Sequence, residues 1–146
     1  MKKLQYGVTL LELMIVVAIV AIISAFAFPS YMQHVVKTKR TVATSALLRI
    51  ADRQQQFFMD NKQFTNDLSN LGFAANPLVL ADDGNNVAAG DADAAYSISL
   101  SNVAATTYTI TAAPLHGQAS RDTDCASLTL NQAGARGNSG GGDDCW

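Results

Sequence analysis

Four pairs of closely spaced aspartates are the residues of this chain best suited to chemistry, because carboxylate oxygens can bind calcium. None has the spacing of an EF-hand loop, so we interpret them as solvated loop acids and expect no metal. His34 and His116 lie far apart in the sequence and accompany no catalytic constellation, so we expect neither an enzyme nor a cofactor. The pairs are Asp82 with Asp83, Asp91 with Asp93, Asp122 with Asp124, and Asp143 with Asp144.

Glu12 is the one glutamate among the twelve acidic residues, and it lies inside the most apolar stretch of the chain. Its polar companions in residues 8–28 are Thr9 and Ser24. A helix of this length would span roughly 31 Å, the thickness of a bilayer core. An ionisable side chain in such a helix costs roughly 2.5 to 3.5 kcal/mol on insertion scales, so its default interpretation is functional, with a partner.

The apolar stretch has three open interpretations. A cleaved secretory signal would use Lys2 and Lys3 as its basic region and the A-x-A pattern at residues 25–27 as its cleavage site. Glu12 in the apolar region and Pro29 soon after the cut count against this signal. A plain membrane anchor would merely tolerate the carboxylate. In the third interpretation the helix inserts into lipid and is later extracted into a protein assembly, where Glu12 meets a partner.

The run Gly7-Val8-Thr9-Leu10-Leu11-Glu12 decides between them. It resembles the processing motif of type IV prepilins and pseudopilins, which is a short basic leader ending in Gly, then an apolar residue, Thr, Leu, an apolar residue and Glu. The resemblance implies that a prepilin peptidase cuts between Gly7 and Val8 and N-methylates the new amine of Val8. The family usually has Phe where this chain has Val8.

The resemblance also makes Glu12, with Thr9 and Pro29, an assembly residue. Cleavage would create a cationic amine on Val8, about one helical turn from Glu12. Unpaired charges are costly inside a packed bundle of helices, so Glu12 of one subunit would pair with the Val8 amine of a neighbour. Pairing within one subunit stays open, because the two groups are close along the helix.

Residues 30–60 keep a helical pattern beyond Pro29, so we expect one kinked helix from residue 8 to about residue 59. Its apolar positions repeat at helical spacing and would face a core. Such a helix is longer than a small globule can bury, so its first half must protrude, as in type IV pilins. The apolar positions are Val35, Val42, Ala43, Ala46, Leu47, Ile50, Phe57 and Phe58.

Charge is segregated along the chain, with a net charge of +4 over residues 30–59 and −7 over residues 60–146. The basic cluster Lys37, Lys39 and Arg40 has three open interpretations. It is a solvated helix face, a site for nucleic acid or anionic lipid, or a contact with the acidic part of another subunit. Nucleic acid is not an expected partner, because phosphate binding to an acidic domain is disfavoured. A local patch around Arg121 and Arg136 is the exception left open.

The remainder of the chain predicts an α+β domain. Residues 61–93 are interpreted as a loop with one short helical turn. Apolar and polar residues alternate over 96–100, 108–112 and 127–131, which predicts three antiparallel strands and leaves room for a fourth.

Cys125 and Cys145 are the two cysteines of the sequence, and we expect them to form a disulfide. No C-x-x-C motif or paired histidine points to zinc, and a membrane span followed by a disulfide is consistent with an exported domain. A C-terminal loop bounded by cysteines is also what many type IV pilins carry, whereas most major pseudopilins of type II secretion lack it.

Short matches over much of the chain resemble the PilE-type minor pilins of Gram-negative bacteria. The implied type IV pilin fold is a long N-terminal helix packed on a small antiparallel sheet with a C-terminal disulfide-bounded loop. Its expected parts are a cleaved leader (1–7), a transmembrane and filament-core helix (8–29), the amphipathic second half of the helix (30–60), an αβ loop (61–93), and the sheet with the disulfide loop (94–146). The matches are at 53–55, 71–72, 108–112, 128–132 and 145–146.

The resemblance implies a structural subunit of a type IV pilus, specifically a minor pilin of the initiation or tip complex that supports assembly, adhesion and twitching motility. Its alternatives are a major pilin, a DNA-uptake or adhesive pilin, and a type II secretion pseudopilin. The implied partners are other pilins, the prepilin peptidase, the inner-membrane assembly platform, and the inner membrane before assembly. The implied location is a single-pass inner-membrane protein with a periplasmic head, and then the surface pilus.

Overall fold

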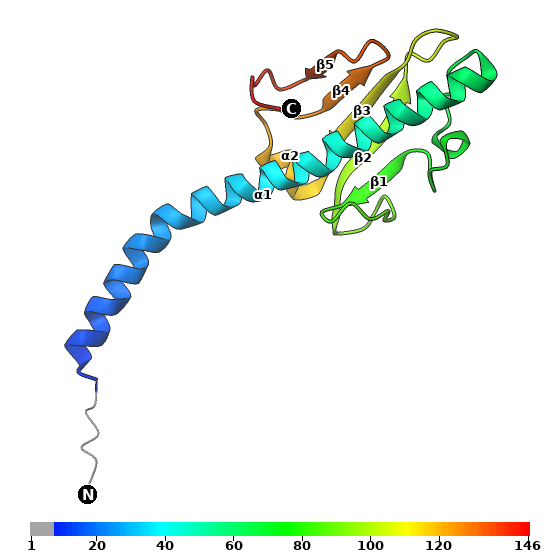
Figure 1. Cartoon of the computed structure of the whole chain (residues 1–146). Helices are drawn as coiled ribbons and strands as arrows, with labels where there is room; N and C mark the ends of the chain where they lie inside the picture. Colours follow the sequence, from blue (N-terminus) through cyan, green and yellow to red (C-terminus); the bar gives the residue numbers. More distant parts are fainter. Residues whose placement is uncertain (1–7) are drawn as a thin grey trace, which may run out of the picture. The chain divides into compact units, whose positions relative to one another are not determined.

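The computed structural model describes residues 8–146. The chain divides into two compact units, with the boundary between Val35 and Val36. A single helix, α1 (Leu10–Asn61), contributes residues to both units (Figure 1). Its bounds fall within two residues of the predicted ones.

The first unit, in its described part, is the apolar start of α1. Side chains of residues 8–31 are exposed, including Leu10 at 78 % and Phe26 at 78 %. α1 continues through Pro29 without a break in helical assignment. By length and composition, α1 contains a segment able to cross a membrane.

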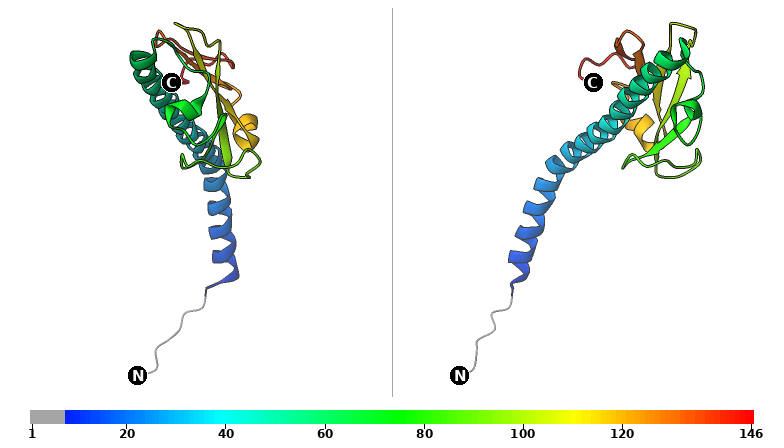
Figure 2. Two further views of the ribbon diagram at one scale, coloured as in Figure 1. Left: turned by 90° about the vertical axis from the view of Figure 1, so that its right-hand side faces the viewer. Right: turned by 45° about the vertical axis from the view of Figure 1, so that its right-hand side comes forward.

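The second unit, residues 36–146, which we call the head, is built on a five-stranded antiparallel sheet. Each strand pairs with the next one along the chain. A short 3₁₀ turn, η1 (Leu68–Leu71), precedes the sheet, and α2 (His116–Arg121) follows its third strand. Figure 2 shows that the second half of α1 lies along one face of this sheet. The strands are β1 (Leu78–Ala81), β2 (Ala94–Ser101), β3 (Thr109–Pro114), β4 (Leu128–Asn131) and β5 (Arg136–Asn138).

The core lies between α1 and the sheet. Leu47 and Ile50 of α1 are completely buried, and each contributes about 1.5–3 kcal/mol of hydrophobic stabilisation relative to an exposed side chain. The predicted apolar stripe is confirmed at its central positions, Ala43, Ala46, Leu47 and Ile50. The same core cluster includes Tyr108, just before β3, and the strand residues Leu78, Leu80, Tyr96, Ile98, Ile110 and Leu128.

Gln54 occupies a core position that the apolar pattern did not predict. It is completely buried, and its amide pairs with the main chain of Thr65. Nε2 donates to the Thr65 carbonyl at 2.6 Å, and the Thr65 N–H donates to Oε1 at 3.1 Å. A buried amide is tolerated because both of its polar ends are satisfied. This pair fixes the chain where it leaves α1.

Three elements differ from the sequence prediction. β1 lies inside the segment interpreted as a loop. The sequence does not reveal this strand, because its four residues are all buried and do not alternate between apolar and polar side chains. β5 is short and polar, and its position follows from pairing with β4 across a turn in which Asn131 Oδ1 accepts the N–H groups of Ala133 and Ala135. α2 is a six-residue helix without a side-chain N-cap, which leaves little signal in the sequence.

Both edges of the sheet are occupied by other parts of the same chain. On the β1 side, the Val87 N–H donates to the Val79 carbonyl at 3.0 Å. On the β5 side, the indole Nε1 of Trp146 donates to the Gly137 carbonyl at 3.0 Å. Open strand edges invite pairing with other chains, so these contacts restrict where another strand can add to the head.

Candidate functional site

The first turn of α1 holds Thr9 and Glu12 in contact. The Glu12 main-chain N–H donates to Thr9 Oγ1 at 3.2 Å, and the Leu13 N–H donates to the Thr9 carbonyl at 3.1 Å. A threonine three residues before a glutamate is the capping-box pattern. A carboxylate in the first turn also stabilises the helix, because its negative charge lies near the positive end of the helix dipole. The sequence therefore starts the helix at Leu10 and leaves Val8 outside it.

The predicted processing residues lie at the edge of the described chain. Gly7 lies outside the described residues, whereas Val8 is described, non-helical and 72 % exposed. Pro29 lies inside α1 and is far along the helix from the first turn. The structure thus brings together Thr9 and Glu12 but not Pro29.

A second group of functional interest lies in the head, where Arg40 of α1 binds Asp122 at the end of α2. Arg40 Nη2 donates to Asp122 Oδ1 at 2.6 Å, and Nε donates to Oδ2 at 3.1 Å. The Asp122 side chain is 1 % exposed and that of Arg40 is 12 % exposed. Hydrogen bonding to Asp122 raises the pKa of Arg40.

Tyr96 and Gln118 complete the polar group around Asp122. The Tyr96 hydroxyl donates to Asp122 Oδ2 at 3.1 Å, and Gln118 Nε2 donates to the Tyr96 oxygen at 3.0 Å. Gln118 also reaches the Val36 carbonyl at 3.3 Å. Burial raises the pKa of Tyr96 well above its ordinary value. The group therefore links α1, β2 and α2 through satisfied buried contacts.

The basic cluster on α1 pairs with acids of its own chain. Lys37 Nζ lies 3.3 Å from Asp144 Oδ2, and Lys39 Nζ lies 2.7 Å from Asp82 Oδ2. With the Arg40–Asp122 pair, every member of the predicted cluster has an intramolecular carboxylate partner. Lys39 and Arg40 therefore do not form a solvated helix face, whereas Lys37 and its partner Asp144 are both largely exposed.

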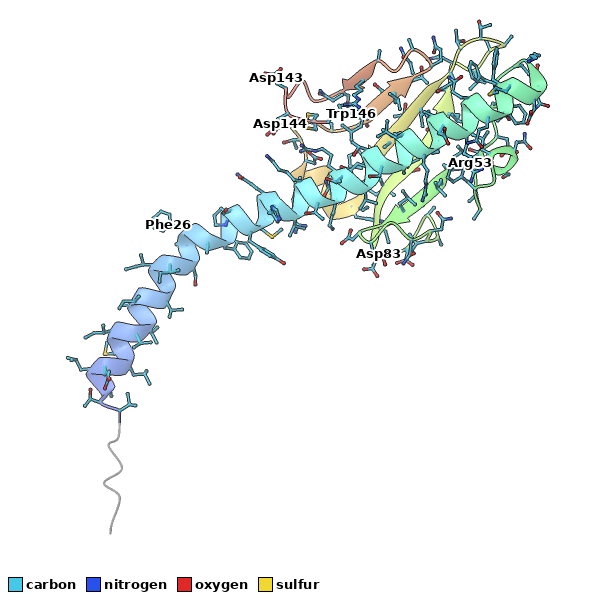
Figure 3. The ribbon with its side chains drawn as sticks, viewed as in Figure 1. Phe26, Arg53, Asp83, Asp143, Asp144 and Trp146 are labelled. Atoms are coloured by element: carbon cyan, nitrogen blue, oxygen red, sulfur yellow. A yellow bond between two sulfur atoms is a disulfide. The ribbon has the colours of Figure 1, made fainter. Side chains whose placement is uncertain are left out.

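The disulfide between Cys125 and Cys145 is present, with the two Cα atoms 5.5 Å apart. It closes the C-terminal loop, whose exposed Asp143 and Asp144 are labelled with Trp146 in Figure 3. Trp146 packs under the guanidinium of Arg136, which lies 5.3 Å from the ring centre. The predicted disulfide is confirmed.

The interpretation of the aspartate pairs as solvated loop acids is wrong for Asp122. Its carboxylate is buried because Arg40, Tyr96 and Gln118 supply donors that replace water. Among residues 8–146 there is no group of three or more His, Cys, Asp or Glu side chains placed to hold a metal ion.

Sequence reasoning missed Tyr96, Gln118 and Asp122 as one group. Tyr96 lies on the apolar face of a predicted strand, whereas Asp122 fits a polar loop and carries no local signal of burial. Gln118 and Asp122 are four residues apart, a spacing that places side chains on one helix face, but nothing in the sequence reveals the short helix. Their convergence on Arg40 depends on the tertiary fold.

An exposed apolar helical segment that leads into a helix packed on an antiparallel sheet, with a disulfide-closed C-terminal loop, is the type IV pilin fold. A family model described as "Type IV minor pilin ComP, DNA uptake sequence receptor" matches residues 29–129, and one described as "Prokaryotic N-terminal methylation motif" matches residues 2–28. This chain belongs to the type IV pilin family.

Similar curated proteins are type IV pilins of bacteria. The type IV major fimbrial protein FimA of Dichelobacter nodosus is 48 % identical over 59 residues, which cover 38 % of this chain and 37 % of FimA. The type IV major pilin protein PilA of Myxococcus xanthus is 35 % identical over 68 residues, which cover 47 % of this chain and 31 % of PilA. The chain thus spans less than two fifths of the length of these relatives.

Proposed function

We propose that this chain is a structural subunit of a type IV pilus and that it acts as a minor pilin in the initiation or tip complex. The observation that carries the proposal is the exposed apolar start of α1, with its single carboxylate, Glu12, in the first turn next to Val8. A long unburied apolar helix needs lipid or other helices as its surroundings. The minor role is supported by the description of the family model. We propose that this role serves assembly, adhesion and twitching motility.

The proposed path begins with insertion of residues 8–29 in the inner membrane as a single span. The prepilin peptidase removes the leader, residues 1–7, by cutting between Gly7 and Val8, and the amine of Val8 is N-methylated. The head lies in the periplasm, where an oxidising environment suits the Cys125–Cys145 disulfide. The assembly platform then transfers the subunit to the pilus. No catalytic step and no cofactor are assigned to the chain.

Glu12 is the residue to which we assign the assembly contact. Glu12 lies in the first turn of α1, and this position supports a contact between its carboxylate and the amine that cleavage would create on Val8. In a bundle of apolar helices, a neighbour's Val8 amine neutralises Glu12 and fixes the axial register of the two subunits. Within an isolated subunit, we propose that the same carboxylate pairs with its own Val8 amine. Assembly then exchanges an internal partner for an external one.

The test of this proposal is Glu12→Ala in the bacterium that produces the chain. We expect normal cleavage of the leader, a normal amount of membrane-inserted protein, and loss of the chain from sheared pili. Ser24→Ala is the matched control, because it removes a polar group from the same apolar helix without removing a charge. Normal incorporation of the Glu12→Ala subunit would contradict the assembly role.

DNA uptake is a second candidate function, favoured by the description of the matching family model as a DNA uptake sequence receptor. Five exposed cations make no ion pair within residues 8–146 and could meet phosphates. Retardation of duplex DNA by the full chain in detergent tests this function. We expect Arg121→Gln with Arg136→Gln to weaken binding about tenfold, and Lys37→Gln to change it little. The cations are Arg49, Arg53, Lys62, Arg121 and Arg136.

A further inference from the structure

Arg40 contacts both of the segments that carry the cysteines. Its Nε and Nη2 bind the carboxylate of Asp122, three residues before Cys125. Its Nη1 donates to the main-chain carbonyl of Asp144, the residue before Cys145, at 2.9 Å. One guanidinium of α1 therefore spans the same two segments that the disulfide joins.

The contact with the first segment is well placed to hold Cys125. The Asp122 carbonyl accepts the Ala126 N–H at 2.7 Å, so Asp122 is tied to the turn that contains Cys125. The buried Asp122 carboxylate is held by three side chains, which limits its movement. A contact between Arg40 and this carboxylate fixes the position of the turn relative to α1.

The contact with the second segment is different in kind. Within the loop, the Gly140 N–H donates to the Cys125 carbonyl at 3.2 Å and the Gly142 N–H donates to the Asp124 carbonyl at 2.8 Å. These bonds join the two segments to each other, whereas Arg40 joins the Asp144 carbonyl to an element outside the loop. Because Arg40 binds a main-chain oxygen there, the contact depends on the path of the chain and not on the Asp144 side chain.

We propose that Arg40 is a positioning residue for the oxidation of Cys125 and Cys145. A disulfide forms only when the two Cα atoms lie within about 4.4–6.8 Å, and a contact that holds the reduced segments at this separation raises the effective concentration of one thiol at the other. Arg40 supplies this contact without bonding to either sulfur, since its partners are Asp122 and the carbonyl of Asp144.

The oxidant in this step is an external disulfide, such as glutathione disulfide. The thiolate of one cysteine attacks it, forms a mixed disulfide and releases one glutathione thiolate. The thiolate of the other cysteine attacks the mixed disulfide and releases the second glutathione. The two cysteine thiols lose two electrons and two protons in total, and glutathione disulfide gains them to become two glutathione thiols.

The test measures the effective concentration of the two thiols in the full chain in detergent. The protein is equilibrated with reduced and oxidised glutathione, the reaction is stopped with acid, and the oxidised fraction is determined by thiol alkylation and mass spectrometry. We expect Arg40→Gln to lower the effective concentration about tenfold under native conditions, because one of several contacts between the segments is lost. In concentrated urea the variant and the natural protein should give equal values, because the contact exists only in the folded chain.

Lys39→Gln is the matched control, because it removes a neighbouring ion pair, with Asp82, that touches neither cysteine segment. It should change the native value less than twofold, although it too removes a charge from α1. This comparison separates positioning from a general effect on stability. The near-ultraviolet circular dichroism of each reduced variant shows whether its head is folded.

Arg40→Lys is the second variant, because its charge stays near Asp122 while a single ammonium cannot span both segments. An unchanged native value in either folded variant would overturn the proposal. Unfolding of the reduced variants but not of the oxidised ones would support the proposal. Arg40 and the disulfide would then each be able to hold the same two segments together. Unfolding of the oxidised variants as well would overturn it, because Arg40 would then be required by the whole head.

Discussion

The guanidinium of Arg40 and the carboxylate of Asp122 form a two-point ion pair inside the head, with Nη2 2.6 Å from Oδ1 and Nε 3.1 Å from Oδ2. Arg40 lies on α1 and Asp122 follows α2, so the pair joins the long helix to an element that comes 82 positions later. A bidentate pair of this kind fixes orientation as well as distance. It ties the second half of α1 to the rest of the head.

Removing one partner of this pair should strongly destabilise the head. Arg40→Gln or Asp122→Asn should lower the free energy of unfolding by about 3–5 kcal/mol, because each leaves a buried group without its counter-charge. Urea unfolding followed by tryptophan fluorescence measures this change. Lys37→Gln should cost less than about 1 kcal/mol, since both partners of the Lys37–Asp144 pair are largely exposed. Equal losses of unfolding free energy in Arg40→Gln and Lys37→Gln would contradict the distinction between the buried and the exposed ion pair.

Stability should fall at alkaline pH through Tyr96. Burial raises the pKa of Tyr96, so the folded chain keeps the phenol proton at pH values at which the unfolded chain releases it. This group leaves the free energy of unfolding unchanged below about pH 10, and lowers it as the pH rises further. Urea titrations at about pH 9 and about pH 11 should show the decline. Tyr96→Phe should reduce the decline, whereas replacement of the exposed Tyr31 by Phe should leave it unchanged.

Removing the disulfide should destabilise the head without changing its fold. Cys125→Ser with Cys145→Ser should cost about 3 kcal/mol in the chain-entropy description of a loop of this size. Thermal unfolding of the double variant and the natural protein measures the loss. An unchanged unfolding temperature would show that the loop is ordered equally well by its other contacts.

Much of the architecture could be predicted because it depends on local patterns. The helical repeat of Ala43, Ala46, Leu47 and Ile50 marks the packed side of α1, and the alternation in β2 and β3 marks two strands. The helix was expected to start at residue 8, and the structure starts it at Leu10, after the capping contact of Thr9. The run Gly7 to Glu12 indicated the family, which the comparisons confirm.

The polar contacts of the head could not be predicted, because they join residues that are distant in sequence. Asp122 lies in a polar run of the sequence, as the exposed aspartates do. Its burial follows from the hydrogen-bond donors of Arg40 and Tyr96, which only the tertiary fold brings to it. The strands β1 and β5 were missed for a related reason. Their pairing partners define them, and their own residues carry no alternating pattern.

The N-cap of α1 gives a prediction for the membrane segment. Thr9→Val removes the hydroxyl that accepts the Glu12 N–H and should destabilise the first turn by about 1 kcal/mol. Amide hydrogen exchange of Glu12 in detergent micelles, followed by nuclear magnetic resonance, should accelerate accordingly. Thr9→Ser keeps the hydroxyl and should retain the exchange rate of the natural protein. Equal acceleration in both variants would argue against capping by the side chain.

The central claim is that the chain enters a pilus as a processed subunit, and mass spectrometry of sheared, purified pili tests it most directly. We predict an N-terminal peptide that begins with N-methylated Val8, at a copy number far below that of the main subunit. A copy number equal to that of the main subunit would keep the pilin assignment but contradict the minor role. Absence of the chain from the pili, or an N-terminus at Phe28, would contradict the central claim itself.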